Sequence, residues 1–313
     1  MKIVVTEPLM IAGKVRDALN QLGEVVYGPF KEDIFMRLLP DCEVLMVRLD
    51  RYIGPDVIRN SPKLRYILTA TTGLDHIDQS TTTAAGVRII CLRDCMDQII
   101  DVSATAEHTW GLLLALVRKT SSAVAHVVSG GWDRNQFWGR QLKGKQLGIV
   151  GHGRIGAMVA VYGAAFGMKV VAHDIDSLLV RPPANYVALD ELIEQSDVIS
   201  VHLTAGPENI QVIDRSLITR MKPGAYFINT ARGMIADSSA LAEAIISGHL
   251  AGVAVDVLAG EEQNAIDENP LLACIRSGGN VLITPHIGGA TIESIAETET
   301  AIVGELKKCL INP

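Results

Sequence analysis

Short runs of β-branched and other apolar residues alternate along the chain with segments of helical periodicity. Five such runs fall in the first 92 residues, and amphipathic stretches separate most of them. This alternation predicts an α/β protein with parallel sheets covered by helices, because parallel strands need long crossover connections. The runs are KIVVTE, EVVYG, VLMVRL, LRYILTA and VRIICL.

The rhythm changes near residue 100, where we place a first domain boundary. A long apolar helical stretch covers 101–129, and a loop rich in Gly and Trp covers 130–145. Six further strands then follow: QLGIVG, KVVAHD, DVISVHL, AYFINTA, LAGVAVDV and NVLITPH. Strands in this rhythm predict a Rossmann-type unit. The tail, 291–310, carries apolar residues at helical spacing, and its pattern allows packing on either domain.

Composition and charge narrow the classes of function. With 48% hydrophobic and 20% charged residues and a net charge of -7, the chain has no basic field for nucleic acid or an acidic membrane. The N-terminus lacks secretory-signal features, and the apolar segment 155–168 is too short for a membrane span. We therefore expect a cytoplasmic protein. The five cysteines have no metal-type spacing, which favours reduced thiols and no metal site.

The segment GHGRIG contains Gly151, Gly153 and Gly156 in GxGxxG spacing. It follows an apolar strand directly and opens a helical pattern that begins with Arg154 and Ile155. In that context the glycines allow a tight turn and bring the backbone close to a pyrophosphate at a helix N-terminus. The segment therefore predicts a dinucleotide site.

Asp174 lies eighteen residues past Gly156, at the end of the strand KVVAHD. A carboxylate there accepts hydrogen bonds from a ribose diol and repels a 2′-phosphate, which favours NAD over NADP. Two alternatives stay open for the turn alone: a glycine turn that binds nothing, and a methyltransferase-like nucleotide site. Neither explains the residues downstream.

Three ionisable residues follow successive predicted strands: Arg232, Glu261 and His286. Ligands bind outside the carboxyl ends of parallel strands, so the three side chains are expected to converge. A guanidinium group can hold a 2-oxo acid by its carboxylate, and a histidine beside a carboxylate can exchange a proton. Each residue alone also has a structural interpretation, as a carbonyl cap, a solvated charge and a packed strand-end histidine.

The segments LGIVGHGRIG, MKPGAYFINTARG, LAEAIISGHLAGVAVDV and LITPHIGG resemble the D-isomer-specific 2-hydroxyacid dehydrogenases, the family of phosphoglycerate, glycerate, formate and D-lactate dehydrogenases. The resemblance covers nearly the whole chain. It implies two Rossmann/flavodoxin-like domains, with an NAD domain, 101–290, inserted into a substrate-binding domain, 1–100 plus 291–313. The last helix then crosses back to the first domain.

The resemblance also implies roles for residues. Arg232 anchors the substrate and polarises its carbonyl, His286 is the acid/base, and Glu261 is its partner. Asp256 lies near the nicotinamide carboxamide, and His202 lies near the adenine side. The remaining matches are the cofactor-lining Thr230, Ala231 and Gly288, and the substrate-binding Arg48, Thr72 and Gly73.

Departures from the family pattern bear on the substrate. Thr69 stands where phosphoglycerate dehydrogenases commonly carry an arginine for the phosphate, which weakens the case for 3-phosphoglycerate as the substrate. Arg48 and Arg134 keep that substrate open. Glu262 and Thr204 replace common prolines, the first after Glu261 and the second two residues after His202. The chain stops directly after the last helix, so we expect no regulatory domain.

These patterns predict an NAD-dependent D-2-hydroxyacid dehydrogenase acting on a small acid of the phosphoglycerate, glycerate/hydroxypyruvate or glyoxylate type. We also expect a homodimer, because similar helices form the dimer contact in this family; intramolecular packing is the alternative. The helical face concerned comprises Trp110, Leu113, Leu114 and Val117. A non-catalytic, NAD-responsive module of the corepressor type stays open. An enzyme of the S-adenosylhomocysteine-hydrolase or alanine-dehydrogenase type shares the turn but not the order of Arg232, Glu261 and His286.

Overall fold

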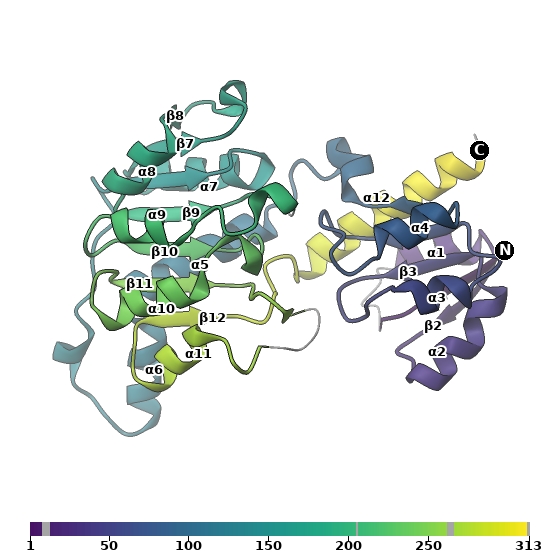
Figure 1. The fold of residues 1–313 in the computed structure, drawn as a ribbon, viewed down its shortest axis with the longest axis horizontal. Helices are drawn as coiled ribbons and strands as arrows, with labels where there is room; N and C mark the ends of the chain where they lie inside the picture. Colours follow the sequence, from purple (N-terminus) through teal and green to yellow (C-terminus); the bar gives the residue numbers. More distant parts are fainter. Residues whose placement is uncertain (8–12, 205, 262–265, 312–313) are drawn as a thin grey trace. The chain divides into compact units, whose positions relative to one another are not determined.

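A computed structural model describes residues 1–7, 13–204, 206–261 and 266–311. The chain divides into two compact units (Figure 1). Unit 1 comprises residues 1–102 and 290–313, and unit 2 comprises residues 103–289. That unit 1 binds the substrate and unit 2 binds the cofactor stays a prediction at this point.

Unit 1 is a five-stranded parallel sheet in the order β2-β1-β3-β4-β5. Its strands are almost uninterrupted apolar runs, as expected for a sheet covered on both faces. The strands are β1 (Lys2–Val5), β2 (Glu24–Tyr27), β3 (Val44–Val47), β4 (Tyr66–Thr69) and β5 (Arg88–Ile90). The helices are α1 (Gly13–Asn20), α2 (Glu32–Leu38), α3 (Pro55–Arg59), α4 (Gln79–Ala84) and α12 (Ile292–Ile311), with short 3-10 turns η1 (Leu39–Asp41) and η2 (Leu92–Gln98).

The last helix, α12, is part of the core of unit 1. Its buried residues Ile302 and Leu306 pack in one cluster with Ile3 of β1 and Leu68 of β4. Figure 1 shows α12 in yellow, running along the N-terminal strands and helices of the same unit. Of the two options that its helical pattern allowed, packing on the N-terminal part is the one observed.

Unit 2 is a seven-stranded, wholly parallel sheet in the order β12-β11-β10-β9-β6-β7-β8. The strands are β6 (Gln146–Val150), β7 (Lys169–His173), β8 (Asn185–Tyr186), β9 (Val198–Val201), β10 (Tyr226–Asn229), β11 (Gly252–Val255) and β12 (Val281–Ile283). The sequence predicted six strands. It missed β8, because this edge strand has only two residues, both of them exposed, and no apolar run to mark it.

Helices cover both faces of this sheet, and short polar caps start several of them. The side chains of Asp214, Asp237 and Asn269 accept the backbone N–H groups that open α9, α10 and α11. The helices are α5 (Ala104–Val117), α6 (Thr120–Val128), α7 (Arg154–Ala165), α8 (Leu189–Gln195), α9 (Arg215–Arg220), α10 (Ser238–Ile246) and α11 (Pro270–Arg276). The 3-10 turns are η3 (Arg134–Phe137), η4 (Ser177–Leu179), η5 (Pro207–Asn209) and η6 (Gly233–Ile235).

The helical stretch expected over 101–129 is two helices rather than one. Lys119 adopts a left-handed backbone with φ of 52°, and α5 and α6 are bent by 64° where they meet. No single helix in the described part of the chain has the length and apolar character to cross a membrane. Taken together, α5 and α6 have the length and composition of a membrane span, but the pair is bent.

The face of α5 proposed for the dimer contact is core instead. Trp110, Leu113 and Val117 are buried against the sheet of their own unit, and the partly buried Leu114 packs beside them. The expectation that Trp110, Leu113 and Val117 meet a second subunit is therefore wrong, because these three side chains are buried in the core of their own unit.

Candidate active site

The glycine turn has the geometry that a bound dinucleotide requires. Gly151 has φ of 90°, and a Cβ atom there would lie 2.7 Å from the carbonyl oxygen of His202. A Cβ atom on Gly156 would lie 2.1 Å from the carbonyl oxygen of Gly151, so only glycine lets α7 pack this close to the turn. Beside Gly153, by contrast, no atom lies within 4 Å of the Cβ position, which leaves room for a pyrophosphate.

The acidic residue at the end of β7 is tied to this turn. The Oδ2 atom of Asp174 accepts the backbone N–H of His152 at 2.8 Å, and its Oδ1 atom accepts that of Asp176 at 3.2 Å. The carboxylate therefore stands beside the glycine turn, where a ribose diol would meet it. Arg154 and Ile155 form the first turn of α7, as the sequence predicted.

His202 follows β9 on the opposite side of the turn. Its Nε2 atom lies 2.8 Å from the hydroxyl oxygen of Ser200. Burial, with a smaller contribution from His152, lowers the pKa of His202 to about 3, so this imidazole is neutral at physiological pH. Thr204, two residues on, is exposed.

The three candidate catalytic residues follow three neighbouring strands: Arg232 comes after β10, Glu261 after β11, and His286 after β12. The Nδ1 atom of His286 lies 2.5 Å from Oε1 of Glu261, and Oε2 of Glu261 accepts the backbone N–H of Leu258 at 2.8 Å. Both carboxylate oxygens are thus engaged, which holds the imidazole ring by one nitrogen and leaves Nε2 as its other proton-carrying atom.

The turn INTARG folds tightly against the end of β11. Asn229 accepts the backbone N–H of Ala231 at 2.9 Å and donates its side-chain amide to the carbonyl oxygen of Arg232 at 2.8 Å. A Cβ atom on Gly233 would lie 2.1 Å from the backbone of Leu258, so glycine is required there. The Nη1 atom of Arg232 donates to the carbonyl oxygen of Ala231 at 2.7 Å.

Asp256 fixes the loop that carries His286. It is almost fully buried and accepts the hydroxyl of Thr284 at 2.5 Å and the backbone N–H groups of Ile287 and Gly288 at 2.9 and 2.7 Å. Burial acts to raise the pKa of Asp256, but these hydrogen bonds and that of His108 hold the pKa below its usual value. Asp256 is therefore an ionised anchor.

His286 itself has a left-handed backbone, with φ of 53°. Such a conformation is uncommon outside glycine and marks positions that the surrounding structure holds in place. The backbone N–H of His286 donates to the carbonyl oxygen of Asp256 at 2.8 Å, which ties the strained residue to the same anchor.

Sequence reasoning missed three residues that complete this arrangement: His108, Thr109 and Thr284. The Nε2 atom of His108 in α5 lies 2.9 Å from the hydroxyl of Thr284 and 3.2 Å from Oδ1 of Asp256. The hydroxyl of Thr109 lies 2.7 Å from that of Thr230, which orients this predicted cofactor-lining residue. The signal available was the polar pair His108 and Thr109 inside an otherwise apolar helix.

The predicted substrate residues of unit 1 follow β3 and β4. Arg48 comes directly after β3, and its backbone N–H donates to Oε1 of Glu7 at 2.9 Å. Thr72 and Gly73 lie in the loop after β4. The carbonyl oxygen of Gly73 accepts the hydroxyl of Thr71 at 2.7 Å, which closes this loop on itself.

Thr69, at the end of β4, is fully buried rather than directed at a ligand. Its hydroxyl lies 2.9 Å from that of Thr71 and 3.0 Å from Nε2 of His76. At the position where the resemblance leads one to expect an arginine for a phosphate, this chain thus has an internally hydrogen-bonded threonine.

The other predicted features are less informative. Glu262 lies outside the described residues. Arg134 opens the exposed turn η3. All five cysteines are free and buried, and the described residues contain no group of three or more His, Cys, Asp or Glu suited to a metal ion.

Residues 110–288 match the family described as D-isomer specific 2-hydroxyacid dehydrogenase, NAD binding domain. The chain belongs to this family, and the matched residues fall within unit 2, which confirms the predicted family, fold class and cofactor.

The chain is also similar to individual proteins. It is 34% identical to D-3-phosphoglycerate dehydrogenase of Mycobacterium bovis over 94% of its length and 33% identical to hydroxypyruvate reductase of Thermotoga maritima over 91%. It spans 54% of the first relative, about half its length, and 90% of the second. The structure of D-lactate dehydrogenase from Aquifex aeolicus, complexed with NAD and lactic acid, matches with a TM-score of 0.84 at 28% identity, covering 100% of this chain and 96% of that one.

Proposed function

We propose that this protein is an NAD-dependent oxidoreductase that interconverts a small 2-oxo acid and the corresponding D-2-hydroxy acid. The observation that carries the proposal is the 2.5 Å contact between His286 and Glu261 at the strand ends of an NAD binding domain, with Arg232 at the end of the next strand. A proton carrier and an anion-binding group beside a dinucleotide turn are the parts that this reaction needs.

Each residue has a distinct role in the proposal. When bound, NAD supplies the hydride exchange with C2 of the acid. His286 gives a proton to the carbonyl oxygen from Nε2 in reduction and takes it back in oxidation. Glu261 holds the Nδ1–H group and stabilises the imidazolium form. Arg232 binds the substrate carboxylate and polarises the adjacent carbonyl. We retain Arg48, Thr72 and Gly73 of unit 1 as proposed substrate-binding residues.

We further propose that the preferred substrate is unphosphorylated, of the hydroxypyruvate or glyoxylate type. The buried, internally bonded Thr69 supports this, because a phosphate needs a cationic or N–H-rich partner that this side chain cannot supply. The hydroxypyruvate reductase of Thermotoga maritima, which the chain matches along nearly its full length, supports the same choice.

The test is NADH oxidation with a panel of 2-oxo acids that includes hydroxypyruvate, glyoxylate, pyruvate and phosphohydroxypyruvate. We expect turnover that falls at least 100-fold in His286→Ala and Arg232→Ala, in line with losses of roughly 10² or more for such groups. The exposed Arg276 provides a matched control for Arg232, as Arg276→Ala. NADH binding with no turnover on any acid contradicts the proposal and favours the non-catalytic module instead. A preference for the phosphorylated acid contradicts the substrate assignment alone.

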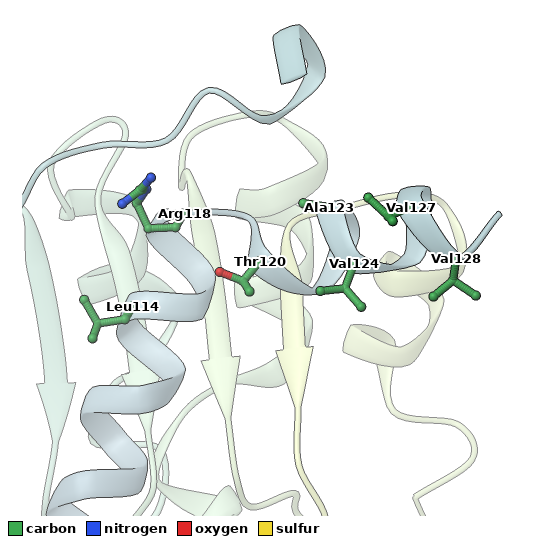
Figure 2. Close-up of a pocket in the computed structure, with 7 residues that line it drawn as sticks. All are labelled: Leu114, Arg118, Thr120, Ala123, Val124, Val127 and Val128. Carbon is green, nitrogen blue, oxygen red and sulfur yellow. The ribbon is translucent and has the colours of Figure 1, made fainter. Parts of the chain in front are cut away.

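We also propose a homodimer formed through α6. This helix has no buried residue, and Val128 is 82% exposed. Figure 2 shows the residues that line a pocket formed by α6 and the end of α5, with Leu114 and Arg118 on one side and Val124 and Val128 on the other. The loop that follows α6 carries two further exposed aromatic residues, Trp132 and Trp138.

Sedimentation of Val128→Glu tests the dimer. We expect a shift from dimer to monomer at micromolar concentration, while Ile246→Glu, a similarly exposed apolar residue on α10, leaves the dimer intact. A monomeric parent protein, or a dimer that both substitutions leave unchanged, contradicts this interface. The cytoplasmic location expected from the sequence stays a prediction.

A further inference from the structure

Glu299 of α12 is a buried acidic residue that the proposed reaction does not use. Its side chain is 0% exposed, and in the described part of unit 1 neither carboxyl oxygen has a hydrogen-bond partner. The Nη1 atom of Arg48 lies 3.9 Å from Oε1 of Glu299, which makes an ion pair but not a hydrogen bond. Burying a carboxylate with so few polar contacts costs free energy, so Glu299 either binds a proton or is stabilised as an anion by Arg48.

The ion pair stands where the topology of unit 1 favours a ligand. In the order β2-β1-β3-β4-β5 the strand order reverses between β1 and β3, and open parallel sheets bind ligands at the carboxyl ends of such a pair. Glu7 follows β1 and Arg48 follows β3. The Arg48 side chain is 27% exposed, so its guanidinium group contacts the buried Glu299 and still reaches solvent.

The charges around Arg48 are mostly negative. Oε1 of Glu7 accepts the backbone N–H groups of Arg48 and Asp50 at 2.9 and 3.3 Å. Arg48 and Glu7 are the charged groups that act on Glu299. Among described residues of α1, β4, β5 and η2, the other elements packed on α12, none adds a charge to Glu299; the titratable Cys95 of η2 faces Glu305 and Lys308 instead.

We propose that Glu299 is a positioning residue for Arg48 whose carboxylate competes with the anionic substrate for the guanidinium group. A proton on Glu299 removes the competitor, so substrate binding is stronger when Glu299 is neutral and weaker when it is ionised. This inference rests on the proposed function, in which Arg48 contacts the acid.

Glu299 is expected to change its charge near neutral pH. Burial raises the pKa of Glu299 to about 7, and burial likewise raises that of Glu7 to about 7. At pH 6 most molecules carry a neutral Glu299, and at pH 8 most carry an ionised one. If only the neutral form binds the acid well, the apparent KM rises by up to about tenfold between these two pH values.

The first experiment does not depend on turnover. Carbon-13 NMR of the full chain with labelled glutamate carboxyl groups follows each titration, in the parent protein, in Glu299→Gln and in Glu297→Gln, which changes an exposed residue on the same helix. We expect two carboxyl resonances with midpoints near pH 7, those of Glu7 and Glu299; only the second is lost in Glu299→Gln, and both are kept in Glu297→Gln. A Glu299 resonance that titrates in the ordinary range of glutamate overturns the inference, whether or not the protein is a dehydrogenase.

The second experiment measures KM and kcat for hydroxypyruvate at saturating NADH from pH 6 to pH 8. At each pH the KM and kcat of the parent are divided by those of Glu299→Gln. Because both proteins contain His286, its titration cancels in these ratios. We expect the KM ratio to rise with pH by up to about tenfold while the kcat ratio stays constant. A flat KM ratio, or a change confined to kcat, overturns the inference. Glu299→Leu removes the same carboxyl group and gives the same KM profile if Glu299→Gln folds poorly.

Should hydroxypyruvate and the other acids show no turnover, the proposed function fails but the inference remains testable. Calorimetry of oxalate binding to the full chain with NADH then replaces the kinetics, with oxalate as a carboxylate probe. We expect weaker binding at pH 8 than at pH 6 in the parent protein and in Glu297→Gln, and no such difference in Glu299→Gln. Equal pH dependence in all three proteins overturns the inference.

Discussion

Glu261→Gln replaces one carboxylate oxygen beside His286 with an amide nitrogen and changes little else. Because Leu258 donates its backbone N–H to Oε2 of Glu261, the glutamine must turn its oxygen toward Leu258 and its NH2 group toward Nδ1 of His286. The imidazole then accepts at Nδ1 and carries its proton on Nε2. In this tautomer Nε2 cannot take a proton from a hydroxy acid, and the imidazolium needed for reduction loses its charged partner.

The expected loss follows from these contacts. A hydrogen bond to a charged group contributes about 1.5–3 kcal/mol, which corresponds to about 10- to 150-fold in rate. The wrong tautomer adds to this, so we expect kcat/KM to fall by about 10² to 10⁴ in both directions. The assay is steady-state NADH oxidation and NAD reduction, with NADH binding measured alongside by fluorescence.

Two controls separate chemistry from structure in this experiment. Glu261→Asp keeps the charge and is expected to lose less activity than Glu261→Gln, and Glu268→Gln changes an exposed neighbour and is expected to lose none. NADH affinity is expected to stay within a few-fold of the parent in all three. If Glu261→Gln retains activity within tenfold of the parent, the Glu261–His286 pair does not carry the proton transfer.

Three further predictions follow from the contacts. Gly156→Ala places a Cβ atom 2.1 Å from the carbonyl oxygen of Gly151, so we expect thermal unfolding to show a loss of about 1–3 kcal/mol, whereas Gly153→Ala, with open space beside it, keeps stability and weakens NADH binding. Asp256→Asn puts an amide NH2 among N–H and O–H donors, and we expect denaturant unfolding to show a loss of about 1–3 kcal/mol together with lower kcat. Burial raises the pKa of Glu299 from 4.5 to about 7, so the free energy of unfolding falls as pH rises from 4.5 to 7. The fall due to this group is up to about 3 kcal/mol, and Glu299→Gln is expected to remove it in denaturant unfolding measured at both pH values.

Much of the fold was predictable because buried parallel strands appear in the sequence as continuous apolar runs. The strands from β1 to β5 and most of those in unit 2 have this character. The edge strand β8, Asn185–Tyr186, does not, and it escaped prediction. The break at Lys119 also gave no local signal, because neither glycine nor proline marks it and the left-handed residue is a lysine.

The candidate site was predictable where one rule of topology governs it. Arg232 and His286 were found because each follows a predicted parallel strand. His108 and Glu299 were missed because their importance lies in contacts with residues far away in the chain: His108 meets Thr284 across 176 positions, and Glu299 meets Arg48 across 251. No spacing rule links such pairs, so only the folded chain reveals them.

The place of α12 in unit 1 has a consequence for how the chain folds during synthesis. Ile302 and Leu306 complete a core that begins with Ile3, so the ribosome must translate α12 before that core can close. Residues 103–289 emerge earlier and hold all of their own sheet. We therefore expect residues 103–289 to fold before the core of unit 1 closes, because the strands of unit 1 need α12.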